Sequence, residues 1–188
     1  EEGKGIAGRL EAELRNLGID SVVTTKLGAT GATTRDFGAA LTKPVHRESI
    51  ARADAIVLSI GANDLRVALL GGRSSESPLD LVDQVLRDIG ATVAELHLIN
   101  PHARILLLGA YIPLPSQRAA RLLEPLIAIW DMALMGQFAD DPLVTVVRLS
   151  DIIDRPERLS TIDSFHPGAA AYQETARRIA ELLAADPS

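Results

Sequence analysis

The sequence predicts an α/β protein: a three-layer sandwich in which helices cover both faces of a mainly parallel sheet. Short apolar runs alternate along the chain with longer segments whose apolar residues recur at helical spacing. Two of these runs, 53–60 and 105–108, are nearly continuous, as in strands that a parallel sheet buries on both faces. No linker, repeat or low-complexity segment interrupts the 188 residues, so we expect residues 1–188 to form a single domain.

The first third of the chain predicts a helix, a strand and a turn rich in small residues. Apolar residues make one helical stripe over 6–17, and Gly18 is placed to end that helix. The β-branched run 22–25 predicts a short strand. It leads into the loop 28–34, after which Asp36 is expected to cap a short helix.

The middle of the chain repeats the strand–helix pattern. Strand 53–60 ends at the turn 61–64, and Ser77 followed by Pro78 marks the start of a helix. Strand 105–108 comes next, and a helical segment over 116–135 follows, which Pro125 is expected to kink or divide.

The end of the chain carries the motif with the clearest chemistry. A strand over 144–149 is followed by Asp163-Ser164-Phe165-His166-Pro167 and a closing helix. Asp163 lies close enough along this loop to hold one ring nitrogen of His166, which leaves the other nitrogen to act as a base. The alternative is an ordinary surface loop in which the aspartate only caps the turn.

Several marked stretches fall at strand ends, where parallel α/β sheets bind their ligands. They are the loop 28–34, the turn 61–64 and the turn 111–113, and the Asp163–His166 loop follows the last strand. Their convergence favours an active site over scattered surface turns. Tyr111 and Ile112 are candidates to line a substrate pocket, although an apolar strand end packed under a helix explains them equally well.

The chain opens with a helix that leads into a strand, whereas right-handed βαβ connections place a strand before such a helix. Flavodoxin-like sheets of strand order 2-1-3-4-5 have their first strand near the middle. We therefore expect a first strand to precede Glu1, so that the domain is incomplete at its N-terminus.

Composition excludes several classes of function. A net charge of −6 with no basic face argues against a nucleic-acid partner. No apolar run is long enough to be a transmembrane segment, and the absence of cysteine excludes disulfides and thiolate sites. No cluster has the spacing of metal ligands, and no cofactor is expected. The sequence leaves the oligomeric state open, and leaves a bacterial cytoplasmic or an exported location open as well.

Three blocks in order make the chain resemble the SGNH (GDSL-type) hydrolase family, and its bacterial lipase/acylhydrolase branch in particular. The blocks are the Gly31-x-Thr loop, the G-x-N-D turn at 61–64, and the D-x-x-H-P motif at 163–167. The runs 28–36, 59–65 and 100–104 carry the resemblance to the branch. The block that names the family, Gly-Asp-Ser, is absent from the chain; in relatives it closes the first strand, upstream of where Glu1 stands.

The resemblance implies a serine ester hydrolase, an esterase, lipase or acylhydrolase, acting on a small acyl ester. In that case His166 is the general base, Asp163 orients it, and Gly31 and Asn63 supply oxyanion donors. The nucleophilic serine is expected before Glu1, because no internal serine replaces it convincingly. Ser59 is expected inside a buried strand, and Ser164 is too close to both partners along the chain.

Three alternatives stay open at this point. Without the resemblance, Asn63-Asp64 is read first as a turn and helix cap, and Gly31 as a residue that permits a left-handed turn. The chain could be a non-catalytic member of the family that binds acyl or glycan ligands without turnover. A flavodoxin-like domain that binds phosphate through loop 28–34 is the third, but that loop lacks the lysine of a phosphate-binding loop.

Overall fold

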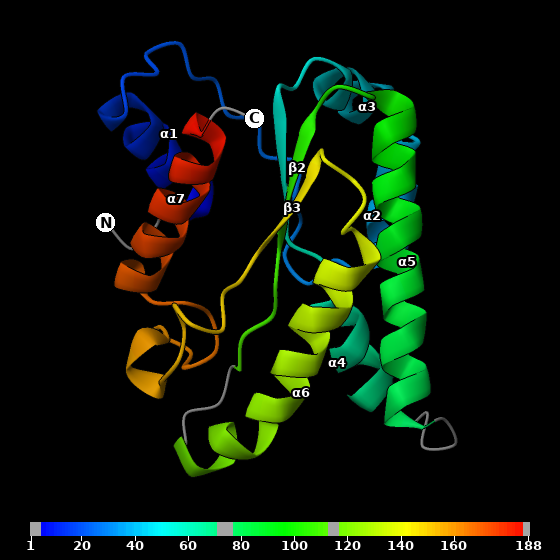
Figure 1. Ribbon diagram of the computed structural model, residues 1–188, viewed down its shortest axis with the longest axis vertical. Helices are drawn as coiled ribbons and strands as arrows, with labels where there is room; N and C mark the ends of the chain where they lie inside the picture. Colours follow the sequence, from blue (N-terminus) through cyan, green and yellow to red (C-terminus); the bar gives the residue numbers. More distant parts are fainter. Residues whose placement is uncertain (1–4, 71–76, 113–116, 186–188) are drawn as a thin grey trace. The chain divides into compact units, whose positions relative to one another are not determined.

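The computed structural model describes residues 5–70, 77–112 and 117–185 (Figure 1). The chain forms two compact units. One comprises residues 1–26, 109–131 and 147–188, and the other comprises 27–108 and 132–146. Every helix within the described ranges is too short or too polar to cross a bilayer.

The second unit is built on a parallel sheet of strand order β1-β2-β3. The strands are β1 (Ala55–Leu58), β2 (Arg104–Leu108) and β3 (Val144–Val147). In β1 and β2, Ala55 lies opposite Arg104 and Leu58 opposite Leu107. The Ile105 N–H donates to Leu143 O at 2.7 Å, so β3 continues the ladder on the other side of β2. The central strand β2 is the most deeply buried of the three, as its unbroken apolar run predicts.

Helices of the same unit pack on one another along α5 (Pro78–Ile99), which contacts α2 (Thr34–Leu41), α3 (Pro44–Ala51) and α4 (Ala62–Leu70) (Figure 1). The apolar stripe of α5 supplies fully buried side chains, among them Ile89 and Leu96, which are both 0 % exposed.

Asn100 joins three segments of this unit and accounts for the conspicuous run 100–104. Its side-chain amide donates to Ile50 O and Ala53 O, both at 2.9 Å. Its side-chain oxygen accepts from the N–H groups of His102 and Ala103, both at 3.1 Å. One buried amide therefore satisfies backbone groups at the end of α3 and at the entry to β2.

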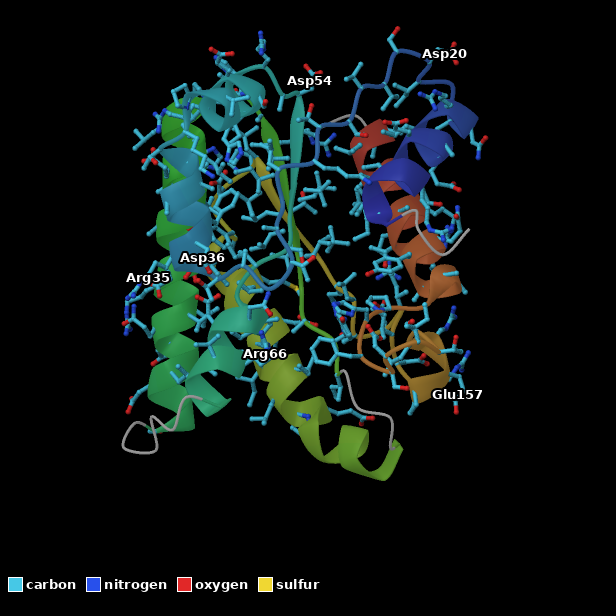
Figure 2. All side chains as sticks on the ribbon, turned by 180° about the vertical axis from the view of Figure 1, so that it is seen from behind. Asp20, Arg35, Asp36, Asp54, Arg66 and Glu157 are labelled. Atoms are coloured by element: carbon cyan, nitrogen blue, oxygen red, sulfur yellow. The ribbon has the colours of Figure 1, made fainter. Side chains whose placement is uncertain are left out.

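The first unit pairs the two ends of the chain. Helices α1 (Ile6–Asn16) and α7 (Ala169–Ala184) lie side by side (Figure 1), with Leu10, Leu14 and Ala176 buried. Arg9 donates to Gln173 at 3.2 Å across this contact. The short 3₁₀ helix η1 (Pro156–Arg158), with Glu157 labelled in Figure 2, leads into the loop before α7.

The α/β class with a parallel sheet is confirmed, and the predicted helices are found. Two short helices, α3 and α4, were not foreseen, because eight or nine residues give too few turns for a clear apolar stripe.

Two local predictions are wrong. Residues 22–25 form no strand, because a strand exists only where a neighbour completes its ladder, and Val22 N–H instead donates to Asp20 O. Thr33, not Asp36, is the N-cap of α2, and Asp36 closes a capping box from the third helical position. Of the two outcomes expected at Pro125, the division is not found, because helix α6 (Gln117–Gln137) runs through Pro125 as one helix.

Candidate active site

The acid and the imidazole of the D-x-x-H-P motif are hydrogen-bonded. Nδ1 of His166 lies 2.5 Å from Oδ2 of Asp163. Oδ1 of Asp163 accepts from the backbone N–H groups of Phe165 and His166, both at 3.0 Å. The ring hydrogen bond, followed by these two amides, lowers the pKa of Asp163 to about 2. The carboxylate is therefore ionised at neutral pH and accepts a hydrogen bond from Nδ1–H of the neutral imidazole. The free lone pair of the ring is then on Nε2.

The His166 side chain is accessible, with half of its surface exposed. Nε2 has no hydrogen-bond partner within the described parts of the chain. The Phe165 ring meets the imidazole edge-on, with the ring centroids 5.2 Å apart. The imidazole is therefore held on one side and open on the other, as a base that must reach a substrate requires.

The backbone of the loop 159–168, here called the His166 loop, is closed on itself. Leu159 and Pro167 form an isolated antiparallel bridge, and the Ser160 N–H donates to His166 O at 2.7 Å. A Cβ at Gly168 would lie 3.0 Å from Leu159 O, so glycine permits this close approach. Helix α7 starts at Ala169, two residues after Pro167, which pairs in the bridge.

Ser164, between the acid and the base, adopts the left-handed conformation with φ 51°. A non-glycine residue is uncommon there, and this one reverses the chain so that His166 can return to Asp163. Ser164 is exposed.

Tyr111 connects the segment after β2 to the His166 loop. Its hydroxyl donates to Phe165 O at 3.3 Å, and burial raises the pKa of this phenol above its ordinary value. The next residue, Ile112, lines a cavity of about 290 Å³ together with Ile127, Ala128 and Ile153. Polar and charged residues line it as well: Glu124, Arg148, Ser150, Asp154 and Arg155. Pro113, the last residue of the predicted turn, lies outside the described residues.

Asp131 is a buried carboxyl in the same unit as Tyr111 and His166, and the sequence gave no signal for its burial. Asp131 on α6 is 2 % exposed, and Oδ2 accepts from the Ser150 hydroxyl at 2.9 Å. Oδ1 has no hydrogen-bond partner among the described residues, and a Cβ on Gly109 would lie 2.7 Å from it. Burial raises the pKa of Asp131, against smaller lowering effects from Ser150, Arg148 and the Ala110 amide.

The other two predicted site residues, Gly31 and Asn63, lie in the second unit. Gly31 has φ 78°, which glycine adopts without strain. Its N–H has no hydrogen-bond partner in the described part of the chain. The Asn63 amide donates from Nδ2 to Ala32 O at 3.1 Å. Because a carbonyl can only accept, this contact identifies the nitrogen end of the amide, and the second hydrogen has no partner among the described residues.

The two segments that carry these donors are also tied together by Asp64, whose contacts the sequence did not reveal. Its carboxylate accepts from the Thr34 N–H at 3.0 and 3.1 Å and from the Thr34 hydroxyl at 2.5 Å. A separation of 30 residues carries no periodic signal, so only the fold could identify this partner.

The structure thus assembles the predicted site residues in two groups. Asp163, His166, Tyr111 and Ile112 belong to one unit, and Gly31 and Asn63 to the other. The predicted burial of Ser59 is wrong, because β1 ends at Leu58 and Ser59 is exposed after it.

Comparison with solved structures defines the class of protein to which this fold belongs. The lipase Lip_vut3 from a goat rumen metagenome superposes with a TM-score of 0.82 at 18 % identity, over 98 % of this chain and 90 % of its own. A catalytic mutant of Axe2, an acetylxylan esterase from Geobacillus stearothermophilus, gives 0.71 at 16 % identity, over 97 % and 81 %. A Clostridium thermocellum family 3 carbohydrate esterase gives 0.63 at 16 % identity, over 97 % and 93 %. The fold is that of the SGNH esterases.

The family follows from the sequence itself. The model of the GDSL-like lipase/acylhydrolase family matches residues 1–174, and the chain belongs to that family. No curated protein is similar enough in sequence to count as a match. Family membership supports a hydrolase of the esterase type with a small-molecule ester substrate.

Proposed function

We propose that the protein is a serine ester hydrolase in which His166 is the general base and Asp163 orients it. The nucleophile in this proposal is a serine that precedes Glu1 in the full-length gene product. The observation that carries the proposal is the His166–Asp163 hydrogen bond on a side chain that keeps half of its surface exposed. A purely structural aspartate cap would need only the two backbone contacts, and would not need to hold the ring as well.

The chemistry is acyl transfer in two steps. Nε2 takes the proton of the serine hydroxyl as its oxygen attacks the ester carbonyl, and then delivers that proton to the leaving alcohol. The ionised Asp163 stabilises the imidazolium that forms in between. A water molecule, deprotonated by the same nitrogen, then hydrolyses the acyl-enzyme and restores the serine.

The negative charge on the tetrahedral oxygen is stabilised by the Gly31 N–H and the Asn63 amide in this proposal. Both donors are neutral, and each has a hydrogen without a partner among the described residues. Loss of one such donor costs about 2.7–4 kcal/mol of transition-state stabilisation, so substitution of Asn63 is expected to lower kcat by about 10²–10³.

Tyr111 and Ile112 are proposed to line the acyl pocket. The phenol is anchored to the backbone next to His166, and Ile112 opens onto the cavity with Ile127 and Ile153. The cavity has a volume of about 290 Å³, and we propose that its apolar lining residues accommodate a short acyl group. The related structures include a lipase and an acetylxylan esterase, both of which are named for ester substrates.

The test uses the full-length gene product and p-nitrophenyl butyrate. We expect hydrolysis by the wild type, its loss in His166→Ala, and covalent labelling of a serine before Glu1 by a fluorophosphonate. His102→Ala is the matched control, because His102 is exposed and lies in the turn before β2 in the other unit.

A full-length protein that hydrolyses no ester and takes up no fluorophosphonate would reject the proposal. The remaining function would then be that of a non-catalytic family member that binds acyl or glycan ligands. Full activity in His166→Ala would reject the assignment of the base and leave the esterase class standing.

A further inference from the structure

The oxyanion donors of the proposed site belong to two segments of the chain. Among the described residues, Asp64 is the one side chain that makes more than one hydrogen bond between these segments. The loop 28–34, here called the Gly31 loop, carries the Gly31 N–H. The N-terminal turn of α4 carries Asn63 and Asp64. The Asn63–Ala32 hydrogen bond is one link between them, and Asp64 supplies three more contacts to Thr34.

The position of Asp64 would allow a simpler role. An acid in the first turn of a helix ordinarily caps free N–H groups of its own helix or interacts with the helix dipole. Both carboxylate oxygens of Asp64 instead accept from Thr34, the first residue of α2. The Thr34 side chain is buried, with 7 % of its surface exposed, so its hydroxyl depends on Asp64 for a partner.

We propose that Asp64 is a positioning residue that presets the oxyanion hole by fixing the Gly31 loop to the start of α4. The inference rests on the proposed function, since it assigns Gly31 and Asn63 to that hole. With Thr34 anchored, the Ala32 carbonyl stays in place to hold the Asn63 amide, and the Gly31 N–H stays at a set position beside it. Preset donors stabilise a developing oxyanion without reorganising, so the role concerns kcat more than substrate binding.

The chain offers a matched control three residues from Thr33. Asp36 accepts from the Thr33 N–H at 2.9 Å and from the Thr33 hydroxyl at 2.7 Å, the same pair of groups that Thr34 offers Asp64. Asp36 stays within the first turn of α2, where Figure 2 labels it beside Arg35. It therefore has the same chemistry without the link to α4.

The variants are made in the full-length protein and assayed with p-nitrophenyl butyrate. Asp64→Ala is expected to lower kcat by about 10- to 100-fold with KM within about threefold, because displacement of a catalytic group by about 1 Å can cost that much. Thr34→Val, which removes only the hydroxyl contact, is expected to fall in between, and Thr34→Ser to retain wild-type kcat. Asp36→Asn is expected to lower thermal stability and leave kcat unchanged.

A second readout does not depend on activity. Amide hydrogen exchange of the 188-residue chain, followed by NMR, is expected to speed up at Thr34 in Asp64→Ala and not in Asp36→Asn. Asp64→Asn keeps one acceptor oxygen for the Thr34 N–H, so it is expected to recover part of both the protection and kcat. Circular dichroism confirms that each variant is folded.

The outcomes separate this inference from the proposed function. A wild type without esterase activity rejects the proposed function and the catalytic part of this inference with it, and the exchange data still decide whether Asp64 fixes the loop. An active wild type with full kcat in folded Asp64→Ala overturns the inference alone. Equal losses of kcat in Asp64→Ala and Asp36→Asn overturn it too, because the effect would then be general to the stability of α2.

Discussion

Replacing Asp163 with asparagine changes which nitrogen of His166 carries the proton. The asparagine side chain has one oxygen. The two backbone N–H groups that donate to Oδ1 of Asp163 would hold that oxygen in place. The side-chain NH2 then faces Nδ1 and can only donate to it. The imidazole must therefore carry its proton on Nε2, the atom that the mechanism needs as a base.

The expected loss is large although the fold is kept. A wrong imidazole tautomer lowers kcat by about 10⁴ in a buried triad. The Asp163 and His166 side chains are 40 % and 50 % exposed, so water can compete for Nδ1 and the loss should be nearer 10³. Each factor of ten corresponds to about 1.4 kcal/mol, which makes the expected increase in activation free energy about 4 kcal/mol.

The assay compares the wild type, Asp163→Asn and Asp163→Ala in the full-length protein. Steady-state kinetics with p-nitrophenyl butyrate give kcat, and ¹⁵N NMR of the His166 ring reports the protonated nitrogen. The reasoning is wrong if Asp163→Asn keeps more than a tenth of wild-type kcat, or if its ring keeps the proton on Nδ1. Asp163→Ala also removes both backbone caps, so it should be less stable than Asp163→Asn.

The same hydrogen bonds determine how stability depends on pH. Because the pKa of Asp163 is lower in the folded state, its ionised form stabilises the fold above the ordinary value of 3.8. That contribution is lost as the pH falls from 3.8 to about 2. The difference in unfolding free energy between the wild type and Asp163→Asn should therefore shrink across this interval, as measured by urea titration. A difference that stays the same between pH 3.8 and about 2 would contradict the assignment.

Two further predictions concern buried polar groups. Asn100→Ala is expected to lower the free energy of unfolding by about 3–4 kcal/mol, because four backbone groups lose a hydrogen bond at about 1 kcal/mol each. The measurement is urea denaturation, and a loss below about 1 kcal/mol would refute the prediction. Asp131→Asn is expected to raise the free energy of unfolding by about 1 kcal/mol at pH 7. The neutral amide avoids burying a charge, and its oxygen can still accept from the Ser150 hydroxyl. Since burial raises the pKa of Asp131, this gain in stability should vanish as the pH falls and the wild-type carboxyl is protonated. An Asp131→Asn variant that is less stable than the wild type at pH 7 would contradict the reasoning.

Local features of the chain were predictable from sequence because local physics decides them. Pro78 begins α5 because its fixed φ suits a first helical turn. Helix α1 ends near Gly18, which adopts φ 86°, where glycine is unstrained. The Asp163–His166 hydrogen bond needs only a three-residue loop, so the motif itself contained that geometry.

Features that depend on distant partners were not predictable. A β-branched run such as 22–25 has strand propensity, but propensity cannot supply the neighbour that completes a ladder. The burial of Asp131 depends on Gly109 allowing close approach, and nothing in the local sequence of either residue signals the other.

The sequence by itself determined the α/β class and the succession of helices and strands, and it supplied the residues that we propose as the acid, the base and the oxyanion donors. Only the tertiary structure decided that both carboxylate oxygens of Asp64 accept from Thr34, and that the Asn63 amide donates to Ala32 O. The physical reason is range: periodicity and caps act over a few residues, whereas a buried polar group takes whichever partner the folded chain brings within hydrogen-bond distance.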